Sequence, residues 1–128
     1  MRLSYTIFYV SDIKKSVHFY ERAFGIKNRF IHESGEYAEM ETGNTTLAFS
    51  ANELAATFFK EGYRKNVPSE KPAGMQIAFE PEDVERAYDS AIKAGATGVS
   101  KPELKPWGWM SAFVRDPDGI LVELAKER

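Results

Sequence analysis

Two stretches of this chain repeat apolar residues at helical spacing, and shorter apolar runs lie around them. The first helix is predicted to begin at Ser11-Asp12, a favoured N-cap, and to end at Gly25. The second is predicted to begin at Pro81-Glu82 and to end at Gly95. Apolar side chains share one face in each: Ile13, Val17, Tyr20 and Phe24 in the first, and Val84, Ala87, Tyr88, Ala91 and Ile92 in the second.

The shorter runs are rich in β-branched and aromatic residues and are bounded by turn residues, which predicts strands. These strands cover residues 3–10, 30–32, 37–41, 45–50, 75–79, 109–115 and 120–125. A short helix is expected within 52–63, and the polar stretch 64–72 is expected to be a connecting loop because it contains two prolines. Asp118-Gly119 predicts a tight primed turn in the last hairpin, since such turns need positive φ.

The order strand, helix, strands occurs twice along the chain. Equivalent landmarks lie 70 to 75 positions apart: Ser11 and Pro81 at the helix starts, Gly25 and Gly95 at the helix ends, and Gly43 and Asp118 at the last hairpin turns. Three matched landmarks in the same order predict a duplicated βαβββ unit. We expect one domain over 1–128, made of modules at about 1–52 and 73–128 joined by 53–72.

The composition of the chain excludes several kinds of site and argues against several kinds of partner. The 128 residues include no Cys, which excludes disulfides, thiolate metal sites and a cysteine nucleophile and makes a reducing cytoplasm the default location. A net charge of −2 gives no support for a nucleic-acid partner. No run of about 18 apolar residues predicts a membrane span, and charged residues from Asp12 onward interrupt any signal-peptide pattern.

One acid interrupts the last apolar strand. Glu123 lies between Val122 and Leu124, and an unpaired charge is costly to bury. Glu123 is therefore expected either on a solvated face of the sheet or in the lining of a cavity.

The two ends of the chain carry motifs of a known family. They are Phe8-Tyr9-Val10-Ser11-Asp12-Ile13, then Ser16-Val17-His18-Phe19-Tyr20-Glu21 and Phe24-Gly25, and near the far end Arg115-Asp116-Pro117-Asp118-Gly119 and Val122-Glu123-Leu124. On these residues the chain resembles the vicinal oxygen chelate superfamily, which includes glyoxalase I, bleomycin-resistance proteins and extradiol dioxygenases. The resemblance implies an α+β fold in which two βαβββ modules form a U-shaped mixed-sheet cavity, and it implies a homodimer.

The resemblance also implies four cavity positions, which hold a divalent metal in the metal-dependent members. They fall on Tyr5, Ala48, Gln76 and Glu123, and the offsets of 71 and 75 agree with the repeat. Only Glu123 is a good metal ligand, Gln76 offers an amide oxygen, and Ala48 offers nothing. We therefore expect no cofactor and no catalytic metal; if a metal bound, Glu123 and Gln76 would hold it.

Without a metal, the predicted cavity keeps a polar set of Tyr5, Gln76, Ser111 and Glu123. By the resemblance, Trp107 and Trp109 lie at the ligand groove, where an indole can stack on a planar or cationic ligand. Two structural alternatives remain open. The tryptophans cover the core edge and a dimer interface, or Glu123 simply hydrogen-bonds Gln76 and Tyr5 across the sheet.

The leading hypothesis is a small-molecule-binding member of the superfamily that works without a metal. The alternative is an enzyme: a lyase or dioxygenase with altered metal ligands, or a metal-free isomerase in which Glu123 is the general base. A third hypothesis is a module without a ligand, whose cavity is filled by Met40, Met75 and Met110.

Overall fold

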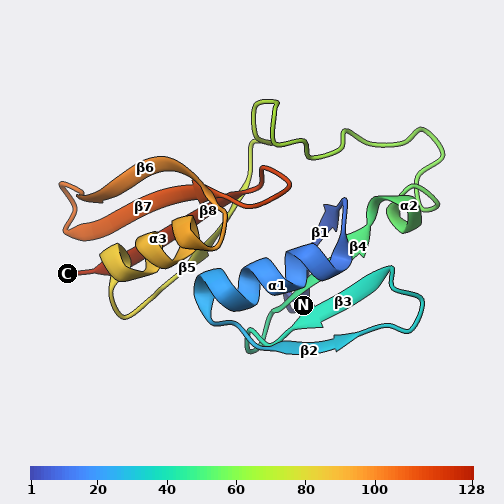
Figure 1. Ribbon diagram of the computed structural model, residues 1–128, viewed down its shortest axis with the longest axis horizontal. Coiled ribbons are helices and arrows are strands. Elements are labelled where there is room, and N and C mark those ends of the chain that lie inside the picture. Colours follow the sequence, from blue (N-terminus) through green and yellow to red (C-terminus); the bar gives the residue numbers. More distant parts are fainter. The chain divides into compact units, whose positions relative to one another are not determined.

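The computed structural model describes residues 1–128 and contains eight strands and three helices (Figure 1). The first half has the order β1 (Tyr5–Val10), α1 (Ile13–Phe24), β2 (Asn28–Ile31), β3 (Tyr37–Met40), β4 (Thr46–Ala51) and α2 (Asn52–Ala55). The second half has the order β5 (Gln76–Phe79), α3 (Val84–Lys93), β6 (Thr97–Leu104), β7 (Trp109–Arg115) and β8 (Leu121–Glu127). None of the helices has the length and apolar composition that a bilayer crossing requires.

The chain divides into two units that have the same topology. Unit 1 comprises residues 1–21 and 25–65, and unit 2 comprises residues 22–24 and 66–128. The sheet of unit 1, sheet A, has the order β1-β4-β3-β2, and the sheet of unit 2, sheet B, has the order β5-β8-β7-β6. In each sheet the first and last strands of the module pair in parallel, and the other pairs are antiparallel. The predicted α+β fold of two βαβββ modules is confirmed, while the single-domain organisation with its boundaries stays a prediction.

Helix α1 has the ends that the sequence predicts. The side chain of Asp12 accepts a hydrogen bond from the Lys15 N–H at 3.0 Å, and Gly25 ends the helix in the left-handed conformation at φ 67°. The apolar face of α1 packs on one face of sheet A, where the ring centroids of Tyr20 and Phe49 lie 5.1 Å apart. Both side chains are fully buried, so this contact is part of the core of unit 1.

Helix α3 begins later than predicted. Asp83, rather than Pro81-Glu82, caps it: the Asp83 carboxylate accepts from the Arg86 N–H at 3.0 Å, which satisfies one of the unpaired donors of the first turn. Ile92, expected on the apolar face, is 38% exposed. Ala87 and Tyr88 of the helix pack against a buried cluster of Val84, Ala112 and Leu124.

The short helix expected within 52–63 is present as α2, which covers Asn52–Ala55. The chain turns after Ala56 and brings Phe59 and Tyr63 against Tyr9 of β1, with ring centroids 6.1 and 5.0 Å from that of Tyr9. Aromatic packing against β1 therefore holds the segment that follows α2.

Strand β6 (Thr97–Leu104) is absent from the sequence prediction. It is the outermost strand of sheet B, and all of its side chains except that of Pro102 are exposed. An edge strand with little burial needs no apolar alternation, so its sequence lacks the signal by which strands are recognised.

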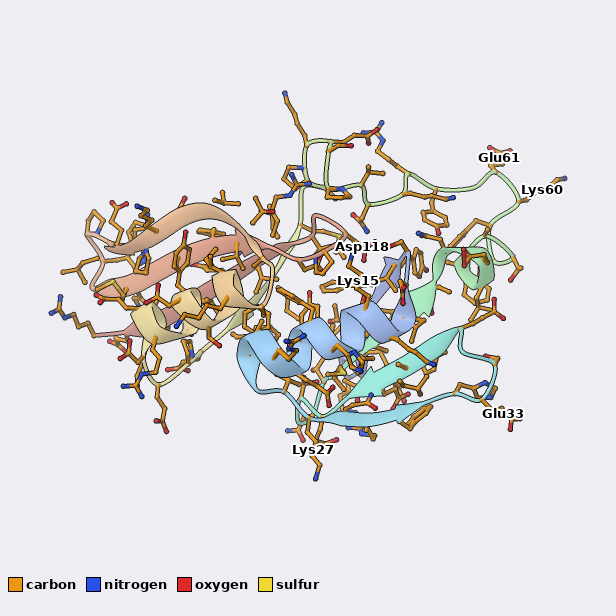
Figure 2. All side chains as sticks on the ribbon, viewed as in Figure 1. Lys15, Lys27, Glu33, Lys60, Glu61 and Asp118 are labelled. Carbon is orange, nitrogen blue, oxygen red and sulfur yellow. The ribbon has the colours of Figure 1, made fainter.

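The last hairpin forms, but the predicted tight primed turn is wrong. Arg115 pairs with Leu121 in register, so the loop between β7 and β8 has five residues, 116–120, including Asp118 (Figure 2). Within this loop only Gly119 has positive φ, at 84°, and every residue of the chain with positive φ is a glycine. The Asp116 carboxylate accepts from the N–H groups of Asp118 and Ile120 at 2.9 and 3.0 Å, so a side chain stabilises the longer loop.

Candidate functional site

The four predicted positions form two pairs, and the members of each pair occupy equivalent places in sheet A and sheet B. Tyr5 and Gln76 are the first residues of β1 and β5, and Ala48 and Glu123 are the third residues of β4 and β8. Ala48 pairs with Ile7 and Glu123 with Ala78, each the third residue of its strand. The internal repeat therefore extends from the order of elements to individual strand positions.

In unit 2 the structure brings three of the predicted residues together. The Gln76 side-chain amide donates to Glu123 Oε1 at 2.8 Å, and the Ser111 hydroxyl donates to Glu123 Oε2 at 2.7 Å. Ser111 is buried and Glu123 is half-buried. These side chains lie on the face of sheet B opposite to α3, because Val122 and Leu124, which alternate with Glu123, are buried on the helix side. We call this surface the Glu123 face.

Both donors to Glu123 are neutral groups. Among the ion pairs of the structure, none includes Glu123. The carboxylate is therefore held in position at both oxygens while its negative charge is not neutralised by a neighbouring cation. Each oxygen also has a second lone pair that can accept a further hydrogen bond.

One aromatic side chain lies next to this carboxylate, and a second lies farther along the same face of β7. Phe113 on β7 lies directly opposite Glu123 in the antiparallel register, and sequence analysis missed it. The period-two spacing of Trp109, Ser111 and Phe113 was the available signal, since it assigns all three to one face of β7. Trp109 is thus on the Glu123 face and half-buried, whereas Trp107 lies in the β6–β7 turn with 70% of its surface exposed.

In unit 1 the predicted positions carry less chemistry. Tyr5 is 47% exposed, and Ala48 is completely buried on the central strand β4. Directly opposite Ala48 lies Glu39 of β3, which sequence analysis missed. Unit 1 therefore also has a carboxylate at this place in its sheet. Strand β3 carries it next to Ala48, whereas in unit 2 the carboxylate belongs to β8.

Glu39 is held by a cation and a phenol. Arg29 Nη1 lies 3.0 Å from Glu39 Oε1, and the Tyr37 hydroxyl donates to Oε2 at 2.8 Å. Arg29 also donates through Nε to Glu41 at 2.7 Å, and Glu39 itself is buried. Burial, together with the Glu39 carboxylate, raises the pKa of the Tyr37 hydroxyl above its usual range. The period-two spacing of Tyr37, Glu39 and Glu41 was the available sequence signal.

The donors at the four positions do not fit a catalytic transition metal. The side chains there are a phenol, an amide, one carboxylate and a methyl group that offers no ligand atom. Such metals prefer several imidazoles and carboxylates. The structure contains no group of three or more His, Asp and Glu side chains suited to hold a metal. His18 and His32 are both exposed, and His32 Nδ1 lies 2.9 Å from the Ser34 hydroxyl in the β2–β3 turn.

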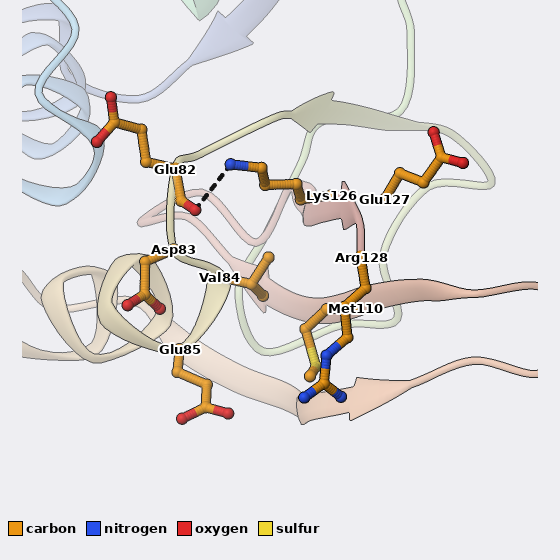
Figure 3. Close-up of a pocket in the computed structure, with 8 residues that line it drawn as sticks. All are labelled: Glu82, Asp83, Val84, Glu85, Met110, Lys126, Glu127 and Arg128. Carbon is orange, nitrogen blue, oxygen red and sulfur yellow. Dashed lines mark hydrogen bonds between the residues drawn. The ribbon is translucent and has the colours of Figure 1, made fainter.

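A separate hollow of about 400 Å³ lies at the start of α3 (Figure 3). Its lining includes Val84 and Met110, which belong to the helix side of sheet B, so it is not part of the Glu123 face. The Lys126 ammonium points toward the Glu82 backbone carbonyl and donates to it at 3.0 Å. Acidic side chains, among them Asp83 and Glu85, outnumber the cations around it.

Similarity to known proteins covers nearly the whole chain. The sequence pattern of the Glyoxalase/Bleomycin resistance protein/Dioxygenase superfamily matches residues 2–124. YraH, an uncharacterized protein of Bacillus subtilis, is 32% identical over 118 residues, which cover 91% of each chain. A probable lactoylglutathione lyase of Vibrio cholerae is 27% identical over 99% of this chain and 91% of its own. A glyoxalase-related enzyme from Fulvimarina pelagi has the same fold, with a TM-score of 0.84 at 20% identity over 98% of this chain and 87% of that chain.

Proposed function

Because the chain belongs to the Glyoxalase/Bleomycin resistance protein/Dioxygenase superfamily, we propose that it binds a small organic cation at Glu123 without a catalytic metal. The observation that carries this proposal is the pair of neutral donors on Glu123. A carboxylate fixed by Gln76 and Ser111 is oriented without being neutralised. A cationic ligand group that reaches it forms a charge-assisted hydrogen bond, which is stronger than a neutral one.

Aromatic residues on the Glu123 face support the same class of ligand. Phe113 lies opposite Glu123, and Trp109 lies on the same face of β7. Aromatic faces attract organic cations and stack on planar rings, and Trp is the most favourable. An amine or amidine attached to a planar ring would use both the carboxylate and the ring of Phe113.

Further parts of the proposal follow from the family. The ligand occupies the U-shaped cavity expected for this fold, the protein acts as a homodimer, and it is located in the cytoplasm. No step of this function uses a metal, which agrees with the poor donor set at Tyr5, Ala48, Gln76 and Glu123.

Tryptophan fluorescence titration tests the proposal. The probes are planar aromatic cations such as acridine orange, bleomycin, and uncharged ring analogues of the same size. We expect saturable quenching by at least one cation and none by its uncharged analogue. Glu123→Gln keeps the side-chain size and removes the charge, and it should weaken binding about tenfold to a hundredfold.

Glu33→Gln is the matched control, since it removes the same charge from an exposed position in the β2–β3 loop (Figure 2). It should leave the affinity unchanged. Equal affinity of the wild type and Glu123→Gln for every probe that binds, or no quenching by any probe, would refute the proposal.

A lyase is the second candidate, because the relative named a probable lactoylglutathione lyase matches 99% of this chain. This alternative requires a metal held by an altered ligand set that includes Glu123. Elemental analysis of protein purified without chelator decides it, together with a lactoylglutathione lyase assay. Stoichiometric Ni, Zn, Fe or Mn that disappears in Glu123→Ala would favour the enzyme over the metal-free binding protein.

A further inference from the structure

Gln76 and Ser111 both donate to Glu123, but a ligand can reach only one of them. Ser111 is 3% exposed, so its hydroxyl is covered and serves to hold the carboxylate. Gln76 is exposed at the start of β5, the edge strand of sheet B. Of the two groups that orient Glu123, Gln76 is therefore the one that can also contact a bound molecule.

The hydrogen bond to Glu123 fixes which way the Gln76 amide faces. An ionised carboxylate can only accept, so the group 2.8 Å from Glu123 Oε1 is the amide nitrogen and not the amide oxygen. The Gln76 oxygen forms no hydrogen bond within the protein. Because the amide oxygen and nitrogen are bonded to the same carbon, this free acceptor lies close to the free lone pairs of the carboxylate.

Small side chains surround these two acceptors on β5 and β8. Ala78 lies directly beside Glu123 in the parallel register, and Ala125, two residues along β8, lies on the same face. Neither side chain extends past Cβ, so neither covers the carboxylate. A ligand group can therefore approach Glu123 and Gln76 from above the sheet, with Phe113 on the other side of Glu123.

We propose that Gln76 selects ligands whose cation carries at least two N–H groups, such as a primary ammonium or an amidinium, over quaternary ammonium ions. One N–H donates to Glu123 and a second donates to the Gln76 oxygen, so the charge of the ligand strengthens both bonds. A quaternary ammonium has the same charge but no N–H group, and it leaves both acceptors without a donor. This specificity rests on the binding of an organic cation at Glu123 that is proposed above.

Isothermal titration calorimetry with two matched probes tests this selectivity. Naphthylmethylammonium and its trimethylated derivative share the ring and the charge and differ in their N–H groups. The wild type should bind the primary ammonium at least about tenfold more tightly, because the trimethylated probe forms no hydrogen bond to either acceptor. Equal affinities, with both probes still requiring Glu123, would overturn the selectivity and leave the cation site standing. Binding of neither probe, or binding that is unchanged in Glu123→Gln, would overturn both.

Two variants separate contact with the ligand from support of Glu123. Gln76→Met keeps the length of the side chain and removes the amide, whereas Ser111→Ala removes only the buried donor to Glu123. Both variants should weaken the binding of both probes. Only Gln76→Met should also lower the ratio of the two affinities, by at least about threefold. An unchanged ratio in Gln76→Met, or an equal fall of the ratio in Ser111→Ala, would show that Gln76 merely orients the carboxylate and would overturn the proposal.

Discussion

Glu39 in unit 1 and Glu123 in unit 2 occupy similar sheets and have different partners. Each carboxylate is bonded at both oxygens, but Glu39 is held by Arg29 and Tyr37, whereas Glu123 is held by Gln76 and Ser111. Glu39 is buried and Glu123 only half-buried. A buried carboxylate paired with a cation stabilises its own unit, while one held by neutral groups keeps its charge for another molecule. The partners of an acid therefore indicate its role better than its strand position does.

The largest expected effect is on stability, and it separates the two acids. Glu39→Ala should lower the free energy of unfolding by about 2 kcal/mol, because a buried group and its bonds to Arg29 and Tyr37 are lost. Glu123→Ala should cost less, about 1 kcal/mol, since Gln76 is exposed and only the buried Ser111 hydroxyl loses its partner. Urea unfolding of both variants measures the difference. Equal losses would show that the two carboxylates have the same structural role.

A smaller effect should appear at alkaline pH. The pKa of Tyr37 is raised in the folded state, so the neutral hydroxyl contributes stability that is complete below the unfolded value of about 10. This contribution is lost as the pH rises from about 10 through the folded-state pKa. Between pH 9 and 11 the wild type should lose more stability than Tyr37→Phe, as measured by urea unfolding. An identical loss in both proteins would contradict the assigned role of the Tyr37–Glu39 bond.

The smallest expected effect concerns the two tryptophans. It tests which of them lies near a ligand bound at Glu123. Trp107→Phe should change the free energy of unfolding by less than about 0.5 kcal/mol, because Trp107 lies exposed in a turn. Quenching by a cationic probe should persist in Trp107→Phe and disappear in Trp109→Phe. The opposite result would place the ligand at the β6–β7 turn and away from Glu123.

Sequence reasoning predicted the elements whose signals are local. Asp12 and Gly25 have side-chain and backbone chemistry that suits helix ends, and the structure confirms both. Strand β6 was missed because an exposed edge strand carries no apolar alternation. The start of α3 was placed too early because Pro81 and Asp83 are both suitable near a helix start, and only the three-dimensional capping bond of Asp83 decides between them.

Part of the candidate site could also be predicted from the sequence. The family resemblance assigned Gln76 and Glu123 to the same set of four cavity positions, and in the structure the Gln76 amide nitrogen lies 2.8 Å from Glu123 Oε1. Phe113 and Glu39 were missed because their importance depends on cross-strand register, which pairs Phe113 with Glu123 and Glu39 with Ala48. Register results from the pairing of distant segments, so a single strand sequence does not reveal it.

Strand β6 has a consequence for the behaviour of the protein in solution. The free edge of a sheet can template the addition of strands from other molecules and so begin aggregation. In β6, Pro102 lacks an N–H group, Lys101 and Glu103 carry charges, and the pairing with β7 is interrupted by two register shifts. These are the features by which natural sheets discourage edge-to-edge association. The polar sequence of β6 lacks the pattern by which strands are predicted, and it also protects this edge of sheet B from aggregation.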